Sequence, residues 1–231
     1  MTPRKHCVLV MMASLIVTMA LPSTAQIPLH EFEQALHSIP VAQVDSMLGA
    51  IELGLNQPDF PAESLLRLID RMARRPAPAI EREAVLVVIT QAIEEGLPIE
   101  GMVDKAFEGL ARNVPMAQLE DGLRQLRTLL AEVRDLLYAR GVFSAAPGTQ
   151  SAVANVLPNT RFNLLVVHIS EAIDDYLSGG GSPFEGHLLY QEVHERLVQL
   201  EGVILDSEDV ALVLERIDPS DLTQVALTAV S

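Results

Sequence analysis

The sequence has one cysteine, Cys7, no tryptophan, and aromatic residues that make up only 4% of its 231 positions. Because Cys7 lies in a segment that we expect to be removed, thiol catalysis, disulfides and thiolate metal sites are excluded from the mature chain. The absence of tryptophan excludes a carbohydrate site built on stacked indole rings. The 49% of hydrophobic residues excludes intrinsic disorder and predicts a core of leucine, valine, isoleucine and alanine.

Basic residues are also scarce, and Lys105 is the only lysine after residue 25. Without Arg4 and Lys5, 14 basic side chains remain against 31 acidic ones. Nucleic acids and anionic lipid surfaces are bound through clustered cations, so this composition argues against both as partners. The acidic balance is compatible with a cationic partner, although solubility alone also accounts for it.

The first 25 residues have the layout of a secretory signal peptide. Arg4 and Lys5 form a short positive segment, residues 8–22 are apolar, and Ser23-Thr24-Ala25 places small residues before a cleavage site. The apolar run ends in a proline and is shorter than the about 20 residues of a membrane-spanning helix. We therefore expect cleavage after Ala25, a periplasmic or secreted mature protein, and no stable transmembrane anchor.

Prolines divide the rest of the chain into helical segments. Seven of them precede a helical pattern, and proline suits the first helical position because its missing N–H would be unpaired there. Helices are predicted over 28–38, 40–55, 61–75, 79–96, 98–113, 115–141, 160–177, 183–201 and 207–230, with Pro219 as a break point in the last one. The fold class is therefore all-α, an irregular array of about nine helices built from helical hairpins.

Residues 115–141 have the clearest helical pattern, with apolar positions that alternate steps of four and three. These positions are Leu119, Leu123, Leu126, Leu130, Val133 and Leu137. They predict a helix about 40 Å long that forms the spine of the fold. The apolar runs 85–89 and 164–167 are similar to strands, but their helix-forming flanks favour buried helices.

Residues 144–159 are rich in small residues and turn formers, so they predict a loop or linker. This segment separates an N-terminal helical region, 26–143, from a C-terminal helical region, 160–231; one continuous domain is the alternative. Ser182 and Glu185 match a capping box at the start of a helix, and Asp218 with Asp221 is a close relative of it.

Four glycines, Gly101, Gly109, Gly122 and Gly186, lie inside helical segments. Glycine costs stability there relative to alanine. We therefore expect close approach of a neighbouring helix at these positions.

One pattern occurs three times: A-I-[DE]-x-x-L, a variable turn, and then P-x-E-[GS]. The copies start at Ala50, Ala92 and Ala172. Each predicts the end of a helix, a turn, and a proline-initiated helix with an acid near its positive end. Stacked helical hairpins build α-solenoids, but the uneven spacing favours an irregular array. The alternative is that shared helix-boundary chemistry alone produces the likeness.

The second copy continues into Gly96-Leu97-Pro98-Ile99-Glu100, Lys105-Ala106-Phe107-Glu108-Gly109-Leu110-Ala111-Arg112 and Val114-Pro115. This stretch resembles a GLPxE…KAxEGxAKxVP segment found in exported bacterial helical proteins with no assigned activity. The match spans residues 96–115 and departs from the pattern at Arg112, where the pattern has lysine. The resemblance implies a helical, envelope-located protein and brings no catalytic residue with it.

The sequence contains no G-x-S-x-G, HExxH, P-loop, GxGxxG or EF-hand motif, so we predict no catalytic residue and no cofactor. The best local constellation is His187, Tyr190, Gln191 and His194, which share one face of the predicted helix 183–201. Zinc or copper would suit two histidines with a carboxylate. However, His187 and His194 are two turns, about 10 Å, apart, so a metal needs ligands from another helix.

His168 lies in an apolar run and is predicted to be a hydrogen-bonded core histidine. Taken together, the sequence favours a non-enzymatic periplasmic helical-repeat protein that binds another envelope protein or acts as an envelope scaffold. Two alternatives stay open: a small-molecule or lipid carrier with an apolar cavity between helices, and a metal-binding protein that uses His187 and His194. The oligomeric state also stays open.

Overall fold

The computed structural model describes residues 27–57, 59–142, 156–202 and 205–230, and within them the chain forms ten α-helices and no β-strand. The helices are α1 (Leu29–His37), α2 (Val44–Leu55), α3 (Ala62–Ala73), α4 (Ala79–Glu94), α5 (Glu100–Ala111), α6 (Met116–Ala139), α7 (Val156–Ser178), α8 (Gly186–Leu200), α9 (Ser207–Arg216) and α10 (Pro219–Ala229). The predicted all-α fold is confirmed. The last predicted helix is broken at Pro219, which gives ten helices instead of nine.

Two of the sequence predictions fall on residues outside this range. The expected signal peptide, residues 1–25, lies outside the described residues. The expected linker, 144–159, lies mostly outside them, and α7 already begins at Val156 within its last residues. The two apolar runs that are similar to strands lie inside α4 and α7, so both are helical as predicted.

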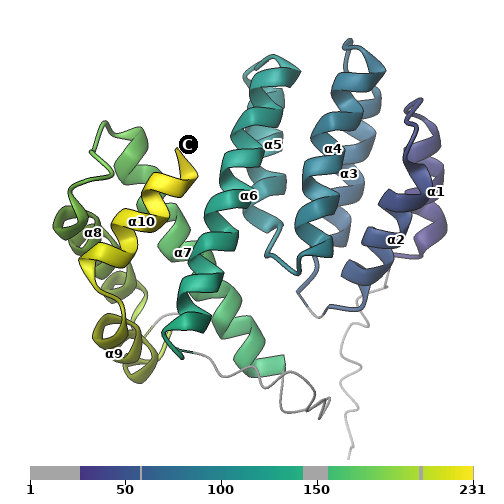
Figure 1. Ribbon diagram of the computed structural model, residues 1–231. Helices are drawn as coiled ribbons and strands as arrows, with labels where there is room; N and C mark the ends of the chain where they lie inside the picture. The colour runs from purple at the N-terminus through teal and green to yellow at the C-terminus, as the bar shows by residue number, and fades with distance from the viewer. Residues whose placement is uncertain (1–26, 58, 143–155, 203–204, 231) are drawn as a thin grey trace, which may run out of the picture.

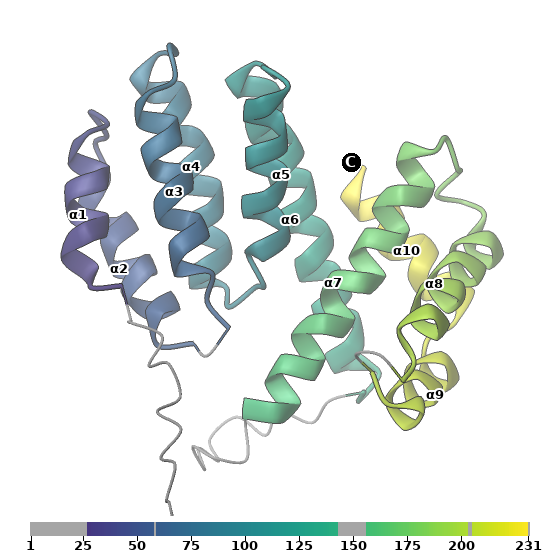
Figure 2. The same cartoon turned by 180° about the vertical axis from the view of Figure 1, so that it is seen from behind.

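Helices α1 to α6 form three hairpins that stack side by side, as Figures 1 and 2 show. One layer contains α1, α3 and α5, which pack in that order; α2, α4 and α6 pack in the same order in the other layer. Each hairpin therefore covers the apolar face that its neighbour would otherwise expose, which is the logic of a helical repeat array.

The four C-terminal helices gather around the end of this stack. Helix α7 packs against α6 and α8, and α10 fills the space between α6 and α8. Figure 2 shows that α7 runs obliquely to α5 instead of joining its layer as the next member. Helix α6 contacts α4, α5, α7 and α10, so the predicted spine is indeed the helix that joins the stack to the C-terminal helices.

A single hydrophobic cluster extends from Phe32 in α1 to Ala226 in α10. The alanine–isoleucine pairs that open the three repeat copies all belong to it, and none of their side chains is more than 3% exposed: Ala50, Ile51, Ala92, Ile93, Ala172 and Ile173. Burial of each isoleucine contributes about 2 kcal/mol. The repeated pattern therefore marks the ends of α2, α4 and α7, where each helix is fixed in the core. The division of the chain into two regions stays a prediction.

The helical glycines divide into two pairs. A Cβ added at Gly186 would stand 2.2 Å from the backbone carbonyl oxygen of Pro219, and one at Gly109 would stand 2.8 Å from Leu119 Cδ1. The predicted close approach is therefore confirmed at these two positions. It is wrong at Gly101 and Gly122, where an added Cβ would have no atom within 4 Å other than those of its own stretch of helix.

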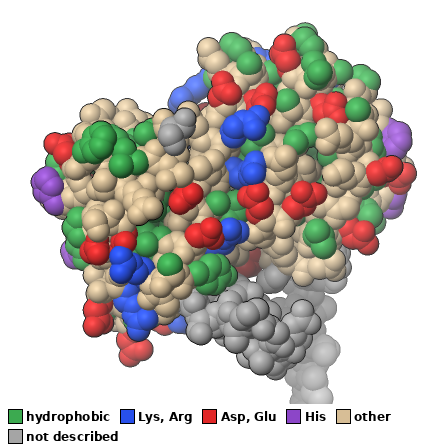
Figure 3. Space-filling model, viewed as in Figure 1, with side chains coloured by type: hydrophobic (Ala, Val, Ile, Leu, Met, Phe, Trp, Pro, Cys, Tyr) green, Lys and Arg blue, Asp and Glu red, His purple; other side chains and the backbone are tan. Residues whose placement is uncertain are grey.

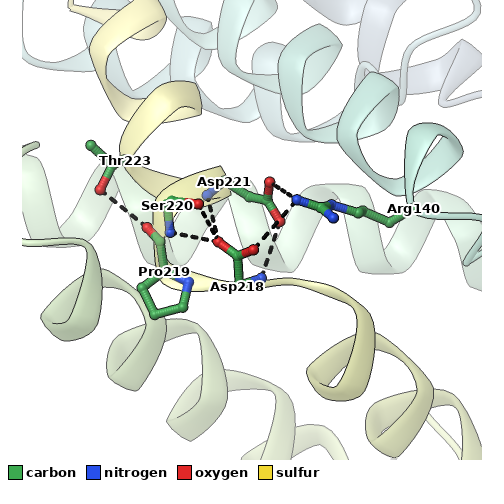
Figure 4. Close-up of polar contacts among 6 residues, drawn as sticks. All are labelled: Arg140, Asp218, Pro219, Ser220, Asp221 and Thr223. Atoms are coloured by element: carbon green, nitrogen blue, oxygen red, sulfur yellow. Dashed lines mark hydrogen bonds and ion pairs between the residues drawn. The ribbon is translucent and has the colours of Figure 1, made fainter.

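Helix α10 begins with the capping box that the sequence indicates (Figure 4). The Asp218 carboxylate accepts hydrogen bonds from the backbone N–H groups of Ser220, at 2.8 Å, and Asp221, at 3.2 Å. The Asp221 carboxylate in turn accepts from the Asp218 N–H at 3.1 Å. Arg140, at the end of α6, forms ion pairs with both carboxylates and so ties the two helix ends together.

The capping box predicted for Ser182 and Glu185 is wrong. Helix α8 begins at Gly186, and its N-cap residue, Glu185, makes no side-chain capping hydrogen bond. The Glu185 carboxylate accepts a hydrogen bond from the Tyr176 hydroxyl at 2.9 Å. The Ser182 hydroxyl accepts one from the Phe184 N–H at 3.3 Å. Because both side chains are engaged inside the α7–α8 turn, the helix starts three residues later than proline placement predicts.

Candidate functional site

A hollow in the described part of the chain lies between α5 and α7, is also lined by residues of α6, and is called here the α5–α7 groove. Its wide part, about 700 Å³, is bounded by the first turn of α5 and the first half of α7. Its narrow part, about 450 Å³, continues toward the carboxyl ends of the same helices. Five residues line both parts, so the two hollows form one groove: Pro98, Gly101, Asp104, Val167 and Glu171.

The rim of the wide part is built by the first two copies of the sequence repeat. The turns after α2 and α4 emerge at the same edge of the hairpin stack, and residues of both turns line the groove. Gly96 ends α4 with a left-handed φ of 70°, and the Leu97 N–H donates back to the Ala92 carbonyl at 2.9 Å. This is the glycine-terminated helix end that reverses the chain into α5.

In the first copy, a glycine positions an aromatic ring at the same rim. A Cβ at Gly54 would stand 2.2 Å from the Phe60 ring, so only glycine lets that ring lie against the end of α2. Tyr138 from α6 and Phe162 from α7 face the wide part from the other side, with ring centroids 4.7 Å apart and planes tilted by 37°. Phe162 is 5% exposed and Tyr138 is 42% exposed, so Tyr138 presents most of the accessible aromatic surface.

The wall that α5 contributes carries two carboxylates without partners. Glu100 and Asp104 lie one helical turn apart, both are exposed, and both line the wide part. Residues four apart on a helix have Cβ atoms about 6 Å from each other. Within the described residues, neither carboxylate has a hydrogen-bond or ion-pair partner.

The cations that line the groove are already paired. Lys105 Nζ lies 2.8 Å from Asp174 Oδ2, and Arg196 pairs with Asp175. Arg134 donates to the Glu95 carbonyl at 2.7 Å and to its neighbour, Asp135, at 2.9 Å. The groove therefore offers unpaired negative charge and no free positive charge in the part of the chain that the structure describes.

On the opposite face of the array, basic side chains of α6 form ion pairs with acidic ones. Figure 3 shows basic side chains standing among acidic ones on the face that α6 crosses. Arg127 of α6 pairs with Glu95 at 2.8 Å, and Arg124 pairs with Glu120 one turn away. Arg127 and Arg124 therefore neutralise Glu95 and Glu120 there, whereas Glu100 and Asp104 have no such partner among the described residues.

Glu171 and His168 face the groove from α7. His168 Nδ1 lies 3.1 Å from Glu171 Oε2, and this hydrogen bond is the main cause that lowers the pKa of the Glu171 carboxyl below its ordinary value. Glu171 therefore stays ionised near neutral pH. The hydrogen bond expected for His168 is confirmed, but its half-buried side chain lines the groove instead of being enclosed by the core.

Ser170 lies at the narrow part and is 1% exposed. Its hydroxyl is buried and has no hydrogen-bond partner in the described residues. A buried hydroxyl without a partner costs about 1–3 kcal/mol.

The face predicted from sequence, His187, Tyr190, Gln191 and His194, lies on α8 and lines no part of the groove. His187, Gln191 and His194 are exposed; the Tyr190 hydroxyl donates to the Leu214 carbonyl at 2.9 Å and so joins α8 to α9. Among the described residues, no group of three or more His, Cys, Asp or Glu side chains is arranged to hold a metal ion. A binding role for this face stays a prediction.

Sequence reasoning missed the groove-lining residues. It explained Glu100 as an acid at the start of a helix, which is correct, but it gave no reason to group Glu100 with Tyr138, Phe162 and Glu171. The one signal was the repeat itself, because its first two copies build the rim.

Comparison with known proteins assigns no family: no family model, curated protein or solved structure matches the chain. The resemblance of residues 96–115 to exported bacterial proteins therefore stays a prediction. In the described ranges, no helix combines the length and apolar character needed to cross a membrane.

Proposed function

We propose that the protein is a non-enzymatic binding protein that holds a short segment of another polypeptide, from an envelope protein, in the α5–α7 groove. The observation that carries this proposal is the continuity of the groove along α5 and α7. The lining residues of α7 run from Phe162 to Asp175. That stretch is about 20 Å long at 1.5 Å per residue, which matches about six residues of extended chain.

The lining also suits a polypeptide. Apolar side chains of α6 and α7, including Leu126, Leu130 and Val167, accept apolar side chains of a bound segment. Carboxylates on the walls provide polar contacts along the same path. Grooves that recognise peptides combine these two kinds of contact, one for affinity and one for register.

A pair of glycines gives a direct test. Leucine at Gly101 would project into the groove, and leucine at Gly122, on α6, would project into open space outside it. Neither change meets an atom close to the new Cβ, so both variants should fold. We expect peptides selected from a random display library on the wild type to bind Gly122→Leu normally and Gly101→Leu at least tenfold more weakly. A library that yields no groove-dependent peptide would contradict the proposal.

A small-molecule or lipid carrier is the second candidate, and the wide part of the groove favours it. Its volume of about 700 Å³ is within the about 300–1,000 Å³ of typical ligand pockets, and it is bordered by aromatic rings. Native mass spectrometry of protein purified from its own cells separates the two candidates. A bound small molecule that Gly101→Leu abolishes would replace the polypeptide proposal.

The location that goes with this function is the periplasm or the cell exterior. The support is the arrangement of residues 1–25, in which a positive segment, an apolar run and small residues follow one another. Amino-terminal sequencing of protein recovered from the host's extracytoplasmic fraction should begin at Gln26. Recovery of uncleaved chain from the cytoplasm would contradict export.

A further inference from the structure

We infer that the segment held in the α5–α7 groove is cationic and carries lysine or arginine at two positions separated by one residue. The inference rests on the proposed function and names the chemistry of the partner. It stands on three observations: the unpaired carboxylates of Glu100 and Asp104, the paired state of the groove's own cations, and the unpartnered hydroxyl of Ser170.

Charge decides which segments the groove accepts. Seven carboxylates and three basic side chains line it, histidine aside, and each of the three basic side chains already has an acidic partner. An acidic segment would find no free cation and would be repelled by the remaining carboxylates. A basic segment finds the unpaired Glu100 and Asp104 on one wall, whereas Glu171 on the other is already engaged by His168 and Arg196. Complementary charge of this kind selects partners and speeds association.

The spacing of the carboxylates defines the motif. Glu100 and Asp104 are four residues apart on α5, which is a rise of about 6 Å along the helix axis. In an extended chain, side chains of residues i and i+2 point to the same side and lie about 6.6 Å apart. A segment that runs along α5 therefore places two basic side chains opposite Glu100 and Asp104 when one residue separates them. The intervening side chain points toward α7 and the apolar floor.

Ser170 provides an independent indication that a polar group enters the narrow part. The residue lines the groove, while its hydroxyl is enclosed and has no partner among the described residues. An extended segment carries a backbone N–H or C=O group at every residue, so a segment beside Ser170 offers this hydroxyl a partner once the side chain rotates toward the groove. A single inorganic cation held by Glu100 and Asp104 would leave the aromatic rim without contacts.

The test uses fluorescently labelled hexapeptides and anisotropy titrations with the full mature chain. One hexapeptide alternates arginine with leucine, and matched peptides replace arginine with glutamine or glutamate. A fourth has the composition of the first with its arginines placed so that no two are separated by a single residue (Arg-Arg-Leu-Leu-Arg-Leu). We expect the alternating arginine peptide to bind at least tenfold more tightly than the glutamine peptide, and the glutamate peptide to bind weakest. The preference should fall between 50 mM and 500 mM salt, because added salt screens exposed charges.

Two double variants assign the preference to the groove. Glu100→Gln with Asp104→Asn should weaken the alternating arginine peptide about tenfold and leave the glutamine peptide unchanged. Glu33→Gln with Glu215→Gln removes the same charge from exposed sites outside the groove and should change neither. Because Glu100 begins α5, Asp104→Asn alone serves as a second variant. Helicity and melting temperature confirm that each variant is folded.

The outcomes separate this inference from the proposed function. Equal binding of arginine and glutamine peptides, both blocked by Gly101→Leu, would overturn the cationic motif and leave the polypeptide groove standing. An arginine preference that Glu100→Gln with Asp104→Asn does not reduce would overturn the assigned carboxylates. Binding of spermidine in the groove while every peptide fails would overturn both in favour of a small cation. Equal affinity for the two arginine spacings would overturn the motif's register.

Discussion

Lys105 on α5 and Asp174 on α7 form an ion pair across the α5–α7 groove, with Nζ and Oδ2 2.8 Å apart. Helices α5 and α7 pack mainly against other helices, so this pair is a direct link between the two walls. It lies at the narrow part, while the walls diverge toward the wide part. The only lysine after residue 25 therefore contributes to the width of the groove and is not available to a ligand.

We expect Lys105→Met to lower the free energy of unfolding by less than about 1 kcal/mol, because pairs exposed to this extent are weak. The side chains of Lys105 and Asp174 are 42% and 40% exposed. Urea denaturation at low salt and in 1 M salt checks this, and the difference from wild type should shrink at high salt. A double-mutant cycle with Asp174→Asn isolates the pair. A coupling energy above about 2 kcal/mol would mean that the pair is far better shielded than this exposure implies.

Alanine substitutions at the helical glycines should change stability in opposite directions. Gly101→Ala and Gly122→Ala should raise the free energy of unfolding by about 0.5–1 kcal/mol, because no atom opposes the new Cβ and alanine favours the helix. Gly186→Ala should lower it by about 1–3 kcal/mol, because the Cβ would stand 2.2 Å from a backbone oxygen of Pro219. Chemical denaturation of the three variants measures this. A neutral Gly186→Ala would show that α8 and α10 do not approach so closely.

Alanine substitutions at the two neighbouring aromatic residues of the groove should affect protein stability and peptide binding to different extents. Phe162→Ala should cost about 3–5 kcal/mol, because the ring is 5% exposed and its removal leaves a cavity. Tyr138→Ala should cost only about 1 kcal/mol, because that ring is 42% exposed. It should nevertheless weaken groove-dependent peptides, since it removes accessible aromatic surface. Urea denaturation and peptide titration of Tyr138→Ala decide the matter, and unchanged peptide affinity would place the binding surface elsewhere.

The helices were predictable from sequence because their signals are local. Apolar spacing and proline positions determine where α4 and α6 begin, and residues 85–89 are helical because their neighbours favour a helix. The groove was not predictable, because it depends on where α7 lies relative to α5. That position is set by packing of α7 on α6 and α8, and of α10 between them, which involves residues far apart in the sequence. Glu100 therefore had a local explanation and no visible relation to Phe162.

The two capping motifs show the same limit within one turn of helix. Asp218 and Asp221 form a capping box, whereas Ser182 and Glu185 do not, although both pairs have the spacing that the motif requires. The difference is the Tyr176 hydroxyl, which donates to the Glu185 carboxylate. A competing partner from the preceding helix thus overrides a local preference, and the sequence pattern alone does not reveal it.

The capping box of α10 should make stability sensitive to acid in a defined direction. Hydrogen bonds from the Ser220 side chain, then the Asp221 backbone, lower the pKa of Asp218 below its ordinary value. A group whose pKa is lower in the folded state stabilises that state when ionised. The contribution of Asp218 is therefore complete above the pKa of about 3.9 that an unfolded chain gives, and is lost as pH falls through the folded value. Asp218→Asn keeps a capping side chain but does not titrate.

We expect the melting temperature of the wild type to exceed that of Asp218→Asn at pH 6, and the gap to close as the pH falls from 5 toward 2. Other carboxylates titrate in both proteins, so the difference between the two isolates Asp218. Ser220→Ala removes the largest cause of the lowered pKa and should move the closing of the gap to higher pH. Ser182→Ala, in the turn where no capping box forms, is the matched control and should follow the wild type at every pH. A gap that stays constant across this range would show that the Asp218 charge contributes nothing, and that its cap acts as a neutral hydrogen-bond acceptor.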